Sequence, residues 1–350
     1  MREAGAGRLR GRWAAAGLAV ALAAALAACG TEPDTTLRPD PPAVTYAPLR
    51  QPFEGATLFL DRDTPAARWQ RATPGSDWLD PITTTPQARW VNGPPDLAPV
   101  PALARRAARR GELLVVVAYW IPDRGCAGYQ EGAPSAAAYE RWVRQLAGAL
   151  GRTPAVVVLE PDAVPADCFG PARAAQLAGA VRILSGAGHA VYLDAGHSAW
   201  KPSGETADRL LASGVAGAEG FAVNVSNRQP TRAAQAWGRE LSDLVGGRPF
   251  VVDVSRNGLG RPPDEPGRDD EWCNPARQGL GVPPTTRTGR PEVDALLWIK
   301  RPGESDGICG GEDTYLFSPR QARTLIANGA GLPAAARRAA AAADIPARDG

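Results

Sequence analysis

The stretch Val156-Val-Val-Leu-Glu-Pro-Asp162 decides the fold of this 350-residue chain. Four consecutive apolar residues without polar alternation predict a strand that is buried on both faces, as in a parallel sheet covered by helices. Pro161 has no main-chain N–H, so it ends the ladder of hydrogen bonds. Asp162 follows at the point where the strand leaves the core, which is the end of the strands where α/β barrels hold their active sites.

Six more apolar runs repeat this pattern, and polar residues follow each of them. The runs are 56–60, 113–119, 190–193, 221–225, 250–254 and 295–300. Segments of helical length, rich in Ala, Leu and Arg, separate most of them. Strands that alternate with helices predict a parallel sheet. Acidic residues at the strand ends favour a barrel of about seven strands with its active site at the C-terminal strand ends. Periodicity alone leaves an open doubly wound sheet as the alternative.

The net charge of the chain is +2, and no basic stripe with interleaved aromatic residues occurs in it. Nucleic acid is therefore not an expected partner. Lysine occurs only at positions 201 and 300, whereas arginine is abundant. An ammonium group is a different donor from a guanidinium group, so Lys300 is a candidate functional residue, with chance survival as the alternative.

The first 29 residues read as an export signal. Four arginines precede an apolar stretch over 13–28 that is too short for a comfortable membrane span. The stretch ends in Leu26-Ala-Ala-Cys29, which is typical of a bacterial lipobox, and this predicts that Cys29 is lipidated. A plain signal peptide cut nearby is the alternative. In either case we expect export, to the outer face of the cytoplasmic membrane as a lipoprotein or as a secreted protein.

Four cysteines remain after Cys29, and four cysteines allow three pairings. Each follows the end of a predicted strand, and we predict the disulfides Cys126–Cys168 and Cys273–Cys309. A metal site is the competing interpretation. The chain has no C-x-x-C pair, and its two histidines are not spaced as ligands, so we expect neither a metal nor another cofactor.

Three further segments complete the predicted organisation. Residues 30–48 are rich in Pro, Thr and Asp and read as a flexible tether. One catalytic domain is expected over 49–330, with the Gly/Pro-rich segment 257–292 as a long functional loop. Residues 331–350 are mostly Ala and Arg and are expected to be a loosely ordered tail, with a short helix as the alternative.

The predicted strand ends bring together aromatic, acidic and histidine side chains, and three tryptophans lie in nearby loops. The strand-end residues are Tyr119, Asp123, Asp162, Asp194, His197 and Asp306, and the tryptophans are Trp90, Trp200 and Trp272. Carboxyl groups supply acid and base functions, and indole faces stack on sugar rings. A lone strand-end aspartate is more often a hydrogen-bond acceptor in a loop than a catalyst. Clustering on one face favours a polysaccharide cleft.

The chain resembles the family-6 glycoside hydrolases, the inverting cellulases. Six motifs in family order, spanning nearly the whole domain, carry the resemblance: Val-Val-Leu-Glu-Pro-Asp (157–162), Tyr-Leu-Asp-Ala-Gly-His-Ser-Ala-Trp (192–200), Val-Ser-Asn (225–227), Asp-Val-Ser-Arg-Asn-Gly (253–258), Glu-Trp-Cys-Asn-Pro (271–275) and Leu-Trp-Ile-Lys-Arg-Pro-Gly-Glu-Ser-Asp-Gly (297–307). Together they are highly specific. The resemblance implies a distorted TIM-like barrel of seven parallel strands that cuts β-1,4-glucan with inversion.

The resemblance also implies roles for single residues. Asp162 matches the general acid, and Asp306 matches the carboxylate proposed as base or as stabiliser. Tyr119 matches the tyrosine beneath the distorted sugar, and Asp194 supports the acid. Positions expected to bind sugar are Trp90, Trp200, His197, Asn227, Trp272, Lys300 and Glu304.

One position departs from the family pattern. The family usually reads Arg-Asp-Cys after the second strand, whereas this chain reads Arg124-Gly125-Cys126. The family aspartate is thought to tune the acid and to hold a water chain, and Gly125 has no side chain to do so. Asp123 is a candidate substitute. Loss of a positioned proton relay costs about 10²–10⁴-fold in rate.

Two functions from different classes follow. The first is an endo-acting β-1,4-glucanase, because the loops after 200 and 258 lack the long insertions that would roof the cleft into a tunnel. Measured turnover would distinguish this function from the second. The second is a surface-anchored glycan-binding protein whose turnover is weak or lost because of Gly125. An unrelated hydrolase of the Ser-His-Asp type would need a G-x-S-x-G turn at a strand end, and the chain has none there. The expected partner is a β-1,4-linked glucan or oligosaccharide, and the expected state is a monomer.

Overall fold

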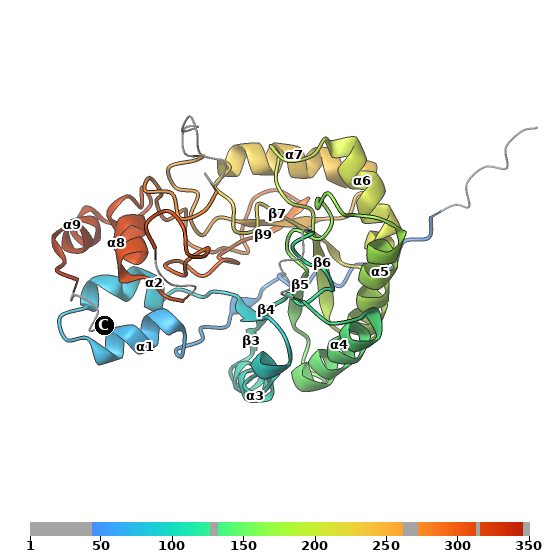
Figure 1. Ribbon diagram of the computed structural model, residues 1–350, viewed down its shortest axis with the longest axis horizontal. Coiled ribbons are helices and arrows are strands. Elements are labelled where there is room, and N and C mark those ends of the chain that lie inside the picture. The colour runs from blue at the N-terminus through green and yellow to red at the C-terminus, as the bar shows by residue number, and fades with distance from the viewer. Residues whose placement is uncertain (1–43, 127–131, 262–271, 313–315, 346–350) are drawn as a thin grey trace, which may run out of the picture. The chain divides into compact units, whose positions relative to one another are not determined.

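The computed structural model describes residues 44–126, 132–261, 272–312 and 316–345 (Figure 1). Seven parallel strands form one sheet in the order β2-β4-β5-β6-β7-β8-β9. Their bounds are β2 Arg89–Val91, β4 Val115–Ala118, β5 Val156–Leu159, β6 Ala190–Asp194, β7 Gly220–Val223, β8 Phe250–Asp253 and β9 Val293–Leu297. The sheet curls until Ala88 N, next to β2, donates a 2.9 Å hydrogen bond to Trp298 O, next to β9. The predicted fold class, a distorted parallel β/α barrel, is confirmed.

One of the seven predicted strands was placed wrongly. The run 56–60 contributes β1 (Thr57–Leu58), which pairs with β3 (Glu112–Leu113) in a separate two-stranded sheet. The seventh barrel strand is instead β2, and so Trp90 lies on a strand and not in a loop. Three residues that include an arginine are too few to show as an apolar run. Pairing with β4 forms this strand, and that pairing is a long-range contact.

The strands are apolar throughout because both of their faces are buried. On β4, Val115 and Val117 point into the barrel, where they join Val158 and Tyr192. Val116, together with Val157 on β5 and Val191 on β6, packs outward against the helices. Such strands need no polar alternation, which is the physical basis of the unbroken runs.

Helices cover the outside of the sheet, with α4, α5, α6 and α7 side by side around the barrel (Figure 1). Ser135 and Ser318 cap α4 and α8 by accepting main-chain hydrogen bonds from Ala138 N and Gln321 N. Gly111 ends α3 in the left-handed conformation, with φ 64°. The α-helices are α1 Pro65–Ala72, α2 Asp80–Thr83, α3 Val100–Arg110, α4 Ala136–Leu150, α5 Pro171–Gly186, α6 Ser203–Ala212, α7 Thr231–Leu244, α8 Pro319–Ala327 and α9 Ala334–Ala342, and short 3-10 helices cover Asp77–Leu79, Pro94–Leu97 and Val215–Gly217.

Both ends of the predicted domain differ from the expectation. The predicted signal with Cys29, and residues 30–43 of the predicted tether, lie outside the described residues. Residues 44–48 belong to the compact unit, because Ala47 N donates to Ala216 O and the Ala47 carbonyl accepts from Arg248. The segment expected to be a loose tail forms α9, which packs against α8 and buries Ala340. Alanine has the highest helix propensity, and one buried face is sufficient to fix the helix.

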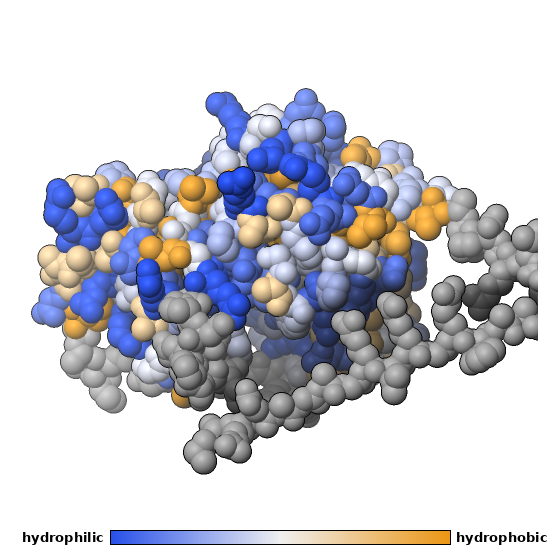
Figure 2. All heavy atoms as spheres, turned by 90° about the horizontal axis from the view of Figure 1, so that it is seen from above, coloured by the Kyte–Doolittle hydropathy of each residue, from blue (hydrophilic) through white to orange (hydrophobic). Residues whose placement is uncertain are grey.

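On the face shown in Figure 2, hydrophilic residues surround scattered groups of apolar residues. Among the described residues, no helix is long and apolar enough to cross a membrane.

Candidate active site

A cavity of about 530 Å³ opens at the C-terminal ends of the barrel strands. It brings together nine of the predicted site residues, which come from all seven barrel strands or the loops that follow them. Its lining is Trp90, Tyr119, Asp162, His197, Ala199, Trp200, Val225, Ser226, Asn227, Arg256, Trp272, Lys300 and Asp306. Carboxyl groups, cations and three indoles thus share one cleft, which is the combination expected for a polysaccharide site.

Asp162 stands on a strained turn after β5. Glu160 and Asp162 both adopt left-handed backbone conformations, with φ 48° and 70°, on either side of Pro161. Residues other than glycine rarely do so without compensation, and such strain is concentrated at functional sites. The main-chain N–H of Asp162 donates a 2.7 Å hydrogen bond to Oδ2 of Asp194. Asp194 ends β6 and is fully buried, so it holds the turn from the next strand.

Burial sets the proton affinity of both carboxyl groups. It raises the pKa of Asp162 to about 6, although the charge of Arg124 opposes the shift. Burial and the nearby Asp162 also raise the pKa of Asp194 well above its usual value. Oδ1 of Asp194 is buried without a hydrogen-bond partner, as expected of a carboxyl that does not carry a full charge. A carboxylic acid with a pKa near 6 can donate a proton at mildly acidic pH.

Asp306 lies among three cations. Arg256 Nη1 lies 2.8 Å from its carboxylate, Arg228 Nη2 3.1 Å and Lys300 Nζ 3.5 Å. Asn274 closes the network, since its N–H donates to Oδ2 at 3.2 Å and its Oδ1 accepts from Asp306 N at 2.9 Å. Although burial alone raises the pKa of Asp306, Arg256, Lys300 and Arg228 together lower it well below its usual value. Asp306 is therefore a fixed anion and a weak proton acceptor.

Tyr119 is held between an indole and a guanidinium group. Its ring meets that of Trp90 edge to face, with centroids 5.4 Å apart. The Arg124 Cζ lies 3.9 Å from the centroid of the Tyr119 ring, and Arg124 Nη1 donates to the Tyr119 carbonyl at 3.0 Å. Burial and the charge of Asp162 raise the pKa of Tyr119, so its hydroxyl stays protonated.

The remaining aromatic residues line the outer parts of the cleft. The Trp272 side chain is 59% exposed and that of Trp200 is 38% exposed, so both present indole faces to solvent. The His197 ring lies 5.5 Å from that of Trp200, and burial together with Arg261 lowers the pKa of His197 to about 4. Asn227 accepts from Arg228 N at 2.8 Å.

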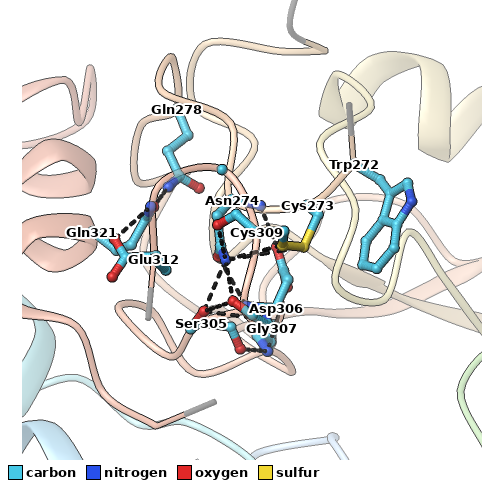
Figure 3. Close-up of a disulfide and its surroundings, with 12 residues drawn as sticks. Trp272, Cys273, Asn274, Gln278, Ser305, Asp306, Gly307, Cys309, Glu312 and Gln321 are labelled. Atoms are coloured by element: carbon cyan, nitrogen blue, oxygen red, sulfur yellow. Dashed lines mark hydrogen bonds and ion pairs between the residues drawn. A yellow bond between two sulfur atoms is a disulfide. The ribbon is translucent and has the colours of Figure 1, made fainter. Parts of the chain in front are cut away.

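Both predicted disulfides are present. Cys126–Cys168 joins the loops after β4 and β5, and Cys273–Cys309 joins the Trp272 loop to the Asp306 loop. Figure 3 shows Trp272 on one side of the second bridge and Asp306 on the other. The amide of Asn274 donates to Ser305 Oγ at 2.8 Å and to Gly307 O at 2.9 Å, so it ties the same two loops together.

Three predicted residues do not line the cavity. Asp194 is fully buried and reaches the site only through its hydrogen bond from Asp162 N. Glu304 forms an ion pair of 2.8 Å with Arg301 Nε, a contact made possible by their spacing of three residues in a turn. Asp123 is exposed on the turn before the first disulfide, where its carbonyl accepts from Arg173 at 2.5 Å. No group of three or more His, Cys, Asp or Glu side chains in the described ranges could hold a metal ion.

The sequence model described as glycosyl hydrolases family 6 matches residues 59–331, which is most of the chain and includes every element of the cleft. The chain belongs to glycosyl hydrolases family 6. The family predicted from the six motifs is thereby confirmed.

Relatives of this family 6 chain include proteins named endoglucanases. It is 39% identical to endoglucanase A of Cellulomonas fimi over 75% of its own length and 58% of the relative's. It is 38% identical to endoglucanase 1 of Streptomyces halstedii, with coverage of 82% and 94%. A solved structure, the endoglucanase Cel6 of Mycobacterium tuberculosis in complex with methyl-cellobiosyl-4-deoxy-4-thio-β-D-cellobioside, is 37% identical with a TM-score of 0.74, and covers 79% of this chain and 99% of that one.

Five charged residues of this family 6 site were missed from the sequence: Arg124, Glu160, Arg228, Asp253 and Arg256. Asp253 is fully buried and accepts main-chain hydrogen bonds from Ser226, Ser255, Ile299 and Lys300, so it fixes three strand ends at once. Each of the five lies within or beside a quoted motif. Their role depends mainly on partners more than 25 residues away, although Ser255 bonds to Asp253 and Tyr119 to Arg124 locally.

Removing the charge of Arg124 should shift the pH dependence of turnover. Because this cation lowers the pKa of Asp162, Arg124→Met should raise that pKa and keep Asp162 protonated to higher pH. The alkaline limb of kcat/KM on a soluble β-glucan should therefore move upward by about one pH unit. Arg144→Met is the control, since Arg144 pairs with Glu140 on the exposed face of α4. An unchanged limb in Arg124→Met would contradict this assignment.

Proposed function

We propose that this chain hydrolyses internal β-1,4-glucosidic bonds of cellulose or related β-glucans with inversion, with Asp162 as the general acid. The observation that carries the proposal is a carboxyl group with a pKa of about 6 on the wall of a cleft flanked by three indoles. The two carboxyl groups differ in protonation state, because Asp162 can hold a proton at a pH where Asp306 is ionised.

The cleft supports distinct roles for its residues. Asp162 protonates the glycosidic oxygen, and Asp194 keeps the carboxyl in place through its main chain. A water molecule attacks the anomeric carbon from the opposite face as the glycosidic bond breaks. Asp306, which three cations keep ionised, is too weak a base to take the proton of that water, so a second water molecule accepts it. Trp200 and Trp272 bind sugar rings on either side, and Tyr119 packs beneath the reacting ring.

The test is hydrolysis of carboxymethylcellulose and mixed-linkage β-glucan by the full chain. Release of reducing sugar with an early fall in viscosity would support endo action. Proton NMR of the first product should show the α-anomer if the configuration inverts. Tight binding of cello-oligosaccharides without release would instead favour the second candidate, a surface-anchored glycan-binding protein disabled at Gly125.

Gly125 provides a direct comparison between these two functions. Gly125→Asp should raise turnover by up to about 10²-fold if a positioned proton relay has been lost at this position. The control is Gly125→Asn, which has the same shape but cannot exchange a proton in this way. Equal activity of wild type and both variants, with the fold intact, would indicate that Asp123 or water replaces the relay.

The sequence of the N-terminal region supports a further proposal on localisation. We propose that the protein is exported and anchored through lipid on Cys29, because Leu26-Ala-Ala-Cys29 reads as a lipobox. Mass spectrometry of the mature N-terminus distinguishes lipidated Cys29 from a plain cleaved signal.

A further inference from the structure

Glu160 is a buried carboxyl group that the cleft does not expose. It follows β5 directly, its relative exposure is 0%, and it does not line the cavity. Burial raises its pKa to about 7, against the effect of two main-chain N–H groups that it accepts. An ionisable group in such a place carries a cost in stability unless it makes specific bonds.

The carboxylate and the main-chain N–H of Glu160 both bond to the end of the neighbouring strand β4. Its Oε2 accepts from Trp120 N at 2.9 Å and from Ile121 N at 3.0 Å, and its main-chain N donates to Ala118 O at 2.8 Å. The ladder between β4 and β5 ends at the pair Ala118 and Leu159. Beyond it, the left-handed Glu160 and the following Pro161 turn the main chain away, so the carboxylate replaces the missing main-chain acceptors.

These hydrogen bonds of Glu160 connect the strand end that bears Asp162 to the strand end that bears Tyr119. On one side, the turn of Glu160 leads within two residues to Asp162. On the other side, the residues next to Trp120 and Ile121 include Tyr119, which lines the cleft, and Arg124, which stacks on Tyr119. A shift of about 1 Å in such a segment can cost about 10²-fold in rate.

We propose that Glu160 is a positioning residue whose buried carboxylate sets where Tyr119 and Arg124 lie relative to Asp162, so that turnover depends on it more than substrate binding does. This inference rests on the proposed hydrolysis. It assigns to Glu160 no contact with the substrate.

The chain offers a closely matched control. Glu219 is 3% exposed, precedes β7 and likewise accepts two main-chain N–H groups, those of Arg50 at 2.8 and 2.9 Å and of Gln51 at 2.8 Å. It lies at the opposite end of the strands from the cleft. Replacing it removes the same kind of bond at a distance from the chemistry.

The experiment compares Glu160→Leu and Glu160→Gln with Glu219→Leu and Glu219→Gln. We expect kcat per folded molecule to fall about 10²-fold in Glu160→Leu. The Kd for a thio-linked cello-oligosaccharide should change less than about threefold, because Tyr119 is only one of its contacts. Glu160→Gln keeps one acceptor oxygen and should retain more activity. Both Glu219 variants should match the wild type in kcat.

Amide hydrogen exchange at Trp120 and Ile121 provides a readout that needs no turnover. Exchange should be slowest in the wild type, faster in Glu160→Gln and fastest in Glu160→Leu. If Glu160→Leu does not fold, Glu160→Gln decides: wild-type kcat and wild-type exchange would overturn the proposal. So would a Kd that rises as much as kcat falls, or an equal loss of kcat in Glu219→Leu.

Failure of the proposed hydrolysis would be seen separately, as absence of release by the wild type. In that case the positioning role is judged from a crystal structure of Glu160→Leu. Tyr119 and Arg124 unmoved relative to Asp162 would overturn it, and their displacement with accelerated exchange would support it.

Discussion

Asp162→Asn is expected to reduce kcat on soluble β-glucan by about 10²–10⁴-fold, the range for loss of a general acid. Asparagine cannot donate the proton, yet it tolerates the left-handed conformation that Asp162 adopts at φ 70°. The fold should therefore survive, which makes Asn a better choice than Ala. Asp208→Asn on the exposed face of α6 is the matched control, and reducing-sugar release at pH 5 to 7 is the measurement.

The same variant should be more stable than the wild type at neutral pH. The pKa of Asp162 is about 6 in the folded protein and about 3.9 in an unfolded chain, so the native state binds the proton more tightly. Stability therefore falls as the pH rises from about 4 to about 6, and the cost of the buried charge persists above that. Since Asp162 is partly exposed, the substitution should raise the free energy of unfolding at neutral pH by at most about 2 kcal/mol. Denaturant unfolding at pH 4 and pH 7 measures it, and an Asn variant less stable than wild type at pH 7 would contradict the buried-charge argument.

Asp306→Asn is expected to destabilise the fold by about 3–5 kcal/mol, the usual cost of breaking a buried ion pair from one side. The substitution leaves Arg256, Arg228 and Lys300 without their shared anion, and the two arginine side chains are 5% and 3% exposed. Because the folded pKa of Asp306 lies below the unfolded value, its contribution is present above about pH 4 and is lost as the pH falls through the folded pKa. Urea unfolding at pH 7 gives the magnitude.

A second buried aspartate separates stability from chemistry. Asp61 is 5% exposed and pairs with Arg89 at 3.8 Å and Arg106 at 3.3 Å, away from the cleft lining. Asp61→Asn should also destabilise the protein while kcat per folded molecule stays at the wild-type level. If Asp306→Asn were as stable as wild type, and azide restored its lost turnover, Asp306 would be the base, and the role of a fixed anion would be wrong.

Much of the site could be read from the sequence because its strand ends carry recognisable local patterns. Apolar runs gave six of the barrel strands, and the polar residues after them include Asp162, Asp194 and Asp306. The two disulfides followed from cysteines placed beside strand ends. Glu304, which was expected to bind sugar, pairs with Arg301 in the same turn and does not line the cleft, because a motif does not reveal which side of a turn faces the cleft.

By itself, the sequence determined the alternation of buried strands and helices and the family, because these depend on burial and on short local motifs. Only the tertiary structure decided that Arg89–Val91 is a barrel strand, that α9 is packed, and that three cations surround Asp306. Each of these depends on contacts between residues far apart in the chain. Proton affinity belongs to the same class, since desolvation and neighbouring charges exist only once the chain has folded.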